Sequence, residues 1–201
     1  MLMARAASRT CLSKSVAHKM LELVALMWVF VACFAFVGLQ RGWTKEIISM
    51  AGITLGLFAL HQFDAALRQQ LLAPFTAGQK FFFQTAIFLA IAFFAYQTRA
   101  LIGSDAREAI GGDGRDPAQS RALGGVVGAA NGYLVSGSIW YFMHINDYPL
   151  SPYLEAPADG SLSFHSIVNL PLYVLAGGPG TSGDLLSLMV IVLFVVVLVL
   201  I

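Results

Sequence analysis

A short polar stretch, GLQRGWTKE at residues 38–46, separates two apolar runs. Gly42 suits a tight reversal, because glycine reaches positive φ without steric cost. Arg41 suits the headgroup level of a membrane, and Trp43 is a typical interface anchor. Glu46 is expected at the start of the next helix, where a carboxylate favours the positive end of the helix dipole. The stretch predicts two helices joined by an anchored turn, and a sharper hypothesis is an Arg41–Glu46 pair that fixes the hairpin angle.

Composition extends this interpretation to the whole chain. The 201 residues are 58% hydrophobic and 11% charged, whereas soluble domains carry about 25% charged residues. A net charge of +1 offers no field to attract nucleic acid, so no nucleic-acid partner is expected. Lipid is therefore the expected surroundings, and the fold class is an all-α polytopic membrane bundle of four to five transmembrane helices. The five apolar segments are residues 21–39, 47–63, 81–96, 122–143 and 185–201.

Segment lengths leave one alternative open. A membrane-spanning helix needs about 20 apolar residues. The first and fourth segments meet this requirement, whereas the second, third and fifth are short, and the second and third could instead form a shallow or buried hairpin. The expected organisation is a basic tail at 1–19, a four-segment membrane domain at 20–143, an external Pro-rich loop at 144–184 and a C-terminal transmembrane helix at 185–201. Within the loop, residues 163–176 are apolar enough for an interfacial helix that Pro171 interrupts.

Small residues recur at every fourth position of the fourth segment. This spacing puts them on one helix face, where a second backbone can approach closely, and helix association in lipid relies on such contacts. We expect the fourth helix to pack on the second within one chain, with self-association through the same face as the alternative. The glycines concerned are Gly124, Gly128 and Gly132, and the second segment repeats the spacing at Gly52 and Gly56.

Few ionisable or amide groups lie within the apolar segments. His61, Asp64 and Asn131 are the candidates for lining a path, because polar groups inside a membrane are often functional. A structural role is preferred for each, and Asn131 is expected to bond across a helix interface. No motif for a nucleotide, a zinc ion or a catalytic nucleophile is present. Cys11 and Cys33 lie in different surroundings, so no disulfide, metal site, cofactor or catalytic residue is expected.

The order of these motifs resembles the colicin V production protein family, the CvpA-type inner-membrane proteins of bacteria. That family shows a first apolar helix, a G-x-x-R-G-x-x-x-E turn and a helix with spaced glycines, and later an Asp-Arg pair followed by a glycine ladder. Ser120 stands where the family has the aspartate, and Asp116 is the candidate substitute. The resemblance covers Val24 to Met143 and rests on Gly38, Arg41, Gly42, Glu46, Gly52, Gly56, Arg121, Gly124, Gly128 and Gly132.

The resemblance implies a multi-pass protein of the bacterial inner membrane with no recognised catalytic site. It implies an accessory or assembly role, without enzymatic activity, in toxin production or secretion or in envelope homeostasis. Other membrane proteins would be its partners. The alternative is a small channel or transporter subunit with polar residues in the helix bundle.

The distribution of Lys and Arg predicts the orientation. Residues 98–121 contain four arginines, whereas residues 144–184 contain no Lys or Arg. Because loops rich in Lys and Arg stay in the cytoplasm, we expect the 98–121 loop to be cytoplasmic and the 144–184 loop to be external. In a chain with Cys11 and Cys33 replaced, Asp113→Cys should resist a membrane-impermeant thiol reagent applied to intact cells, and a cysteine in the second loop should react. Labelling of Asp113→Cys from outside would reverse this topology.

Overall fold

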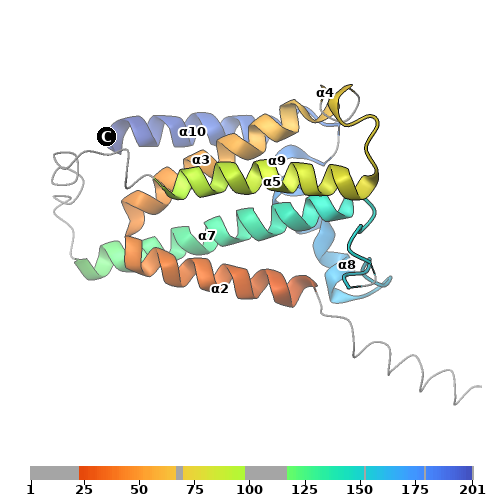
Figure 1. Cartoon of the computed structure of the whole chain (residues 1–201). Helices are drawn as coiled ribbons and strands as arrows, with labels where there is room; N and C mark the ends of the chain where they lie inside the picture. The colour runs from red at the N-terminus through yellow and green to blue at the C-terminus, as the bar shows by residue number, and fades with distance from the viewer. Residues whose placement is uncertain (1–22, 67–69, 98–116, 152, 179, 201) are drawn as a thin grey trace, which may run out of the picture.

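The computed structural model describes residues 23–66, 70–97, 117–151, 153–178 and 180–200 (Figure 1). Four long helices form the bundle: α2 (Leu23–Arg41), α3 (Trp43–Gln62), α5 (Ala77–Tyr96) and α7 (Pro117–His144). The shorter elements are α4 (Asp64–Ala66), α8 (Leu162–Ser166), the 3-10 helix η2 (Ile167–Asn169), α9 (Pro171–Ala176) and α10 (Asp184–Leu200). The predicted basic tail at residues 1–19 and most of the arginine-rich loop lie outside the described residues.

The all-α polytopic bundle predicted from the sequence is confirmed. The four long helices are apolar and long enough to cross a membrane. The second and third segments reach 20 residues each because the first turns of α3 and α5 contain polar residues that the apolar pattern excluded, such as Thr44 and Gln79. The α5 helix starts with a capping box, in which Thr76 and Gln79 satisfy each other's backbone N–H groups. The α10 helix has 17 residues and lies along α3 (Figure 1).

Large apolar side chains cover the outside of the bundle. Trp28 and Phe36 of α2, Phe94 of α5 and Leu198 of α10 are all more than half exposed. A soluble monomer rarely presents so much contiguous apolar surface, whereas lipid is a suitable solvent for it. The composition and the four long apolar helices together indicate a multi-pass membrane protein.

The fourth helix, α7, packs on the second, α3, as predicted, but its glycine ladder (Gly124, Gly128 and Gly132) faces α2 instead. The carbonyl groups of Phe34 and Gly38 lie where side chains on the ladder would project. A Cβ atom at Gly128 would lie 2.5 Å from the Phe34 carbonyl oxygen and 3.0 Å from the Gly38 Cα atom. Because all three ladder glycines are buried in this contact, their face is not available to a second copy of the chain.

The glycines of α3 have a different partner, namely α5. A Cβ atom at Gly52 would lie 2.7 Å from the Ala95 Cβ atom, and one at Gly56 would lie 2.7 Å from the Ile91 Cγ2 atom. The four-residue spacing correctly predicted a close-packed small-residue face on α7 and another on α3. It does not predict which helix packs against each face. The two contacts together bring α2 to α7 and α5 to α3.

The Pro-rich segment folds back onto the bundle. Pro171 occupies the first turn of α9, where its missing N–H costs nothing. Its ring lies against Gly137 of α7, and the flanking Leu170 and Leu172 are buried. Residues 162–176 are therefore helical with a break before Pro171, and they pack against α7 in addition to forming a connection.

Close packing at the ladder gives a direct prediction. Gly128→Leu should destabilise the protein by about 1–3 kcal/mol or more, because added core volume forces backbones apart. Val126→Leu is the matched control, since Val126 is 69% exposed on the other side of α7, and it should change stability by about 0.5 kcal/mol at most. Thermal unfolding in mild detergent measures both. Equal melting temperatures for the two variants would remove the argument for close contact between α2 and α7.

Candidate functional site

The turn between α2 and α3 consists of one residue outside helical geometry. Gly42 has φ 82° and ψ 160°, a conformation that a residue with a side chain rarely adopts. Its N–H group donates to the Gly38 carbonyl at 3.0 Å, and its carbonyl accepts from the Glu46 N–H at 3.3 Å. Arg41 therefore ends one helix while Glu46 lies in the first turn of the next. The turn places the two side chains on the same side of the hairpin.

Arg41 and Glu46 form a buried ion pair. The Arg41 Nη1 atom donates to the Glu46 Oε1 atom at 2.8 Å, and the Arg41 side chain is 12% exposed while that of Glu46 is 0% exposed. The predicted pairing of these residues is thus confirmed. A buried pair stabilises a fold only when further hydrogen bonds satisfy the remaining polar atoms, so the surroundings of both groups matter.

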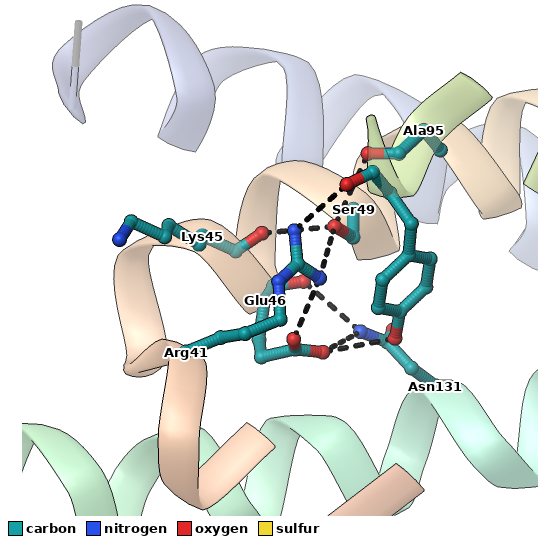
Figure 2. Close-up of polar contacts among 7 residues, drawn as sticks. Arg41, Lys45, Glu46, Ser49, Ala95 and Asn131 are labelled. Carbon is teal, nitrogen blue, oxygen red and sulfur yellow. Dashed lines mark hydrogen bonds and ion pairs between the residues drawn. The ribbon is translucent and has the colours of Figure 1, made fainter. Parts of the chain in front are cut away.

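Two other helices complete the shell of the Glu46 carboxylate. The Tyr96 hydroxyl, at the end of α5, donates to the Oε2 atom at 2.9 Å. The Asn131 Nδ2 atom, in the middle of α7, donates to the same oxygen at 2.8 Å and to the Glu46 carbonyl at 3.0 Å. Figure 2 shows Arg41 and Asn131 approaching Glu46 from opposite sides. The expectation that Asn131 bonds across a helix interface is confirmed.

The guanidinium group of Arg41 has partners beyond the carboxylate. Its Nη2 atom donates to the Tyr96 carbonyl at 3.1 Å, and its Nη1 atom lies 3.2 Å from the Ser49 hydroxyl. The Arg41 Cζ atom also lies 4.5 Å from the centre of the Tyr96 ring, within the range of a cation–π interaction. Because the last carbonyls of a helix lack internal partners and carry partial negative charge, Arg41 also caps the end of α5.

We call Arg41, Glu46, Ser49, Tyr96 and Asn131 the hairpin network. It joins α2, α3, α5 and α7 at one level of the bundle (Figure 2). Both carboxylate oxygens of Glu46 accept hydrogen bonds. The Asn131 Oδ1 atom is buried without a hydrogen-bond partner among the described residues, because its amide nitrogen faces the carboxylate. The arrangement suits a rigid junction between helices.

Sequence reasoning missed two members of the hairpin network. Tyr96 ends the third apolar segment, so it resembles an interface anchor in the sequence, and only the return of α5 brings it to Glu46. Ser49 follows Glu46 by three residues, and this spacing puts both on one face of α3. That spacing was the available signal for Ser49, whereas no local pattern connects residues 46 and 96.

His61 and Asp64 lie at the opposite end of α3 from the hairpin network. Both line a cavity of about 220 Å³, which Gln84 of α5 also lines. The His61 Nε2 atom bonds to the Thr181 carbonyl at 3.0 Å, and the Gln84 Nε2 atom donates to Asp64 Oδ1 at 3.0 Å. Asn131 does not join them, because its partner Glu46 precedes His61 by fifteen residues of α3, or about 22 Å.

Ser120, which the resemblance aligns with the family's aspartate, lies beside the turn. Its Oγ atom would be 3.3 Å from a Cβ atom placed on Gly42. Arg121, the other half of that motif, is exposed at the start of α7. Asp116, the candidate substitute for the missing acid, lies outside the described residues. Ser120 therefore lies next to the hairpin turn.

The fold and the hairpin network define a class of protein: a polytopic helical membrane protein built on an ion-paired helical hairpin. Residues 24–169 match the family model of the colicin V production protein, and the chain belongs to that family. The match continues beyond Met143, where the resemblance seen in the sequence ends, and it includes α8 and η2. No curated protein and no solved structure matches the chain significantly.

The hairpin network predicts graded effects on stability. Arg41→Met leaves the Glu46 carboxylate buried without its cation and should cost about 3–5 kcal/mol. Tyr96→Phe removes one hydrogen bond to a charged group and should cost about 1.5–3 kcal/mol. The matched controls are Arg121→Met and Tyr153→Phe, at exposed positions, which should each change stability by about 0.5 kcal/mol at most. Unfolding in mixed micelles measures all four, and a stable Arg41→Met variant would contradict the assignment.

Proposed function

We propose that this protein is an accessory or assembly factor of the bacterial inner membrane, without enzymatic activity, in toxin production or secretion or in envelope homeostasis. Membership of the colicin V production protein family supports this role. The four long apolar helices suit an inner membrane, where helical bundles are the usual spanning structures. Its partners would be other membrane proteins.

The main support for this proposal is the burial and full hydrogen bonding of the Glu46 carboxylate. A catalytic acid or base must come within hydrogen-bond distance of a substrate atom. Glu46 is instead fully buried, and Arg41, Tyr96 and Asn131 supply donors to its two oxygens. The hairpin network thus uses its polar groups to position helices, as a scaffold requires.

The outer surface supports docking of a partner in the plane of the membrane. The ladder face is occupied by α2, so a partner would have to contact another face. On α5, the adjacent Phe93 and Phe94 are 59% and 69% exposed. Aromatic side chains supply large contact areas at interfaces between proteins. We propose that such apolar helix faces carry the contacts, with the hairpin network holding their relative angles.

A charge-free variant separates a scaffold from a catalyst. In a deletion strain, Arg41→Met and Glu46→Met alone should each lower the membrane level of the protein and the rescue of the phenotype together. The double variant Arg41→Met/Glu46→Met should recover part of both, because it removes the uncompensated buried charge of the single variants while the Tyr96 and Asn131 donors still lose their acceptor.

Glu155→Met is the matched control, since Glu155 is exposed in the segment after α7, and it should complement fully. Immunoblotting of membranes gives the amount of each variant, so that rescue is expressed per molecule. A double variant that reaches the normal membrane level without any rescue would show that the charges themselves perform the function, and the scaffold proposal would fail.

A further inference from the structure

Residues 162–176, which contain α8, η2 and α9, connect two points at one end of the bundle. We call it the α7 end, because α7 and α3 end there while α2 starts there (Figure 1). At the first point, the Ser163 hydroxyl accepts a hydrogen bond from the Val24 N–H of α2 at 3.5 Å. Beyond these residues, the Thr181 carbonyl lies 3.0 Å from the His61 Nε2 atom, near the end of α3. The chain therefore approaches and leaves the bundle at the same end.

Between these two points the chain runs inward beside α7. The Pro171 ring lies against Gly137, which is seven residues, or about 10 Å, before the last residue of α7, His144. The Tyr133 hydroxyl, from one turn further inside α7, donates to the Asn169 carbonyl. Figure 1 shows α9 set inward from the ends of α5 and α7. Asn169 and Pro171 therefore lie well inside the α7 end.

The start of α2 shows how deep these contacts are. α2 is antiparallel to α7, and Gly132 lies against Val31, eight residues after the first residue of α2, Leu23. Leu23 is thus about 12 Å nearer the α7 end than Gly132, and Asn169, bonded to Tyr133, is about 10 Å inside the level of Leu23. Because α2 is long and apolar enough to cross a membrane, it starts near the edge of the hydrocarbon core, which is about 30 Å thick. Asn169 therefore lies at the depth of the core.

The composition of this part of the chain suits that depth. The sequence from 160 to 183 contains no Asp, Glu, Lys or Arg. Its large exposed side chains are apolar, namely Leu162, Phe164, Val168 and Val174, and Val168 is 68% exposed. A charged side chain is costly within a bilayer, whereas an apolar one is not. The face turned away from the bundle is therefore compatible with lipid.

The helix break before α9 also has its backbone groups satisfied. Within lipid, an irregular backbone is tolerated only where the protein itself supplies hydrogen-bond partners. The Asn169 carbonyl accepts from Tyr133, and Pro171 has no N–H to satisfy. The Leu170 N–H donates to the Ile167 carbonyl at 3.1 Å, and the Leu170 carbonyl accepts from an N–H of α9 at 3.0 Å. The break can therefore lie below the headgroups without unpaired backbone groups.

We propose that residues 162–176 form a re-entrant membrane segment whose exposed face contacts lipid acyl chains. The segment enters the leaflet at the α7 end, turns at Pro171 and returns to the same side. It differs from the interfacial helix expected from the sequence because it passes below the headgroups. Lipid is the occupant of the exposed face because that face is apolar and lies at the depth of the hydrocarbon core. Lipid contact is independent of the accessory role, since it is measured on the reconstituted protein alone.

Fluorescence quenching in nanodiscs tests this contact. In a full-length chain with Cys11 and Cys33 replaced, an environment-sensitive fluorophore is attached at Val168→Cys. Lipids with a nitroxide on the acyl chain should quench it, and iodide in the buffer should quench it severalfold less than the same fluorophore at Asp159→Cys. Asp159 is exposed before α8 and serves as the aqueous control. Val126→Cys, at a position 69% exposed on α7, is the lipid-facing control.

Val174→Cys repeats the measurement on α9, so that the decision does not depend on the folding of one variant. Quenching by nitroxide lipid together with protection from iodide is the expected result at Val168 and Val174. Iodide quenching at either position equal to that at Asp159→Cys would place the face in water and overturn the proposal. Protection from iodide without quenching by nitroxide lipid would also overturn it, because protein and not lipid would then cover the face.

Discussion

A single carboxylate, that of Glu46, constrains the arrangement of the bundle. An ionised carboxylate removed from water costs several kcal/mol unless it is paired and hydrogen-bonded. In this chain it is fully buried, and the donors that satisfy it come from α2, α5 and α7. These helices must therefore reach α3 at one level, and the ends of α2 and α5 are fixed by the same contacts. Glu46 lies in the first turn of α3, so the positive end of the helix dipole also stabilises its carboxylate.

This arrangement requires the backbones of α2 and α7 to approach each other closely. Arg41 lies in the last turn of α2, so its position depends on how closely α2 lies against α7. The ladder glycines allow that contact, since a side chain at Gly128 would meet the Phe34 carbonyl group. In lipid, apolar burial provides little drive for helix association, and close van der Waals contact provides more. The packing of small residues and the hairpin network thus act on the same four helices.

Local patterns predicted the elements of this structure, but not all of their neighbours. The apolar runs predicted the spanning helices, and the Arg41–Glu46 pair followed from the turn because its two members are five residues apart. Four-residue spacing predicted a close-packed face on α7, yet a repeat identifies a face and not its partner. Tyr96 and Gln84 escaped notice because their partners come from distant segments. Long-range hydrogen bonds of this kind have no signature in a single sequence.

A double-mutant cycle between Arg41 and Glu46 tests the central claim most directly. The free energy of unfolding is measured in mixed micelles for the unmodified chain, for Arg41→Met, for Glu46→Met and for the double variant. A buried pair that acts as a unit predicts a coupling energy of about 1–3 kcal/mol, with the double variant less destabilised than the sum of the two single variants. Additive effects, within about 0.5 kcal/mol, would show that the two side chains act independently and would contradict the account.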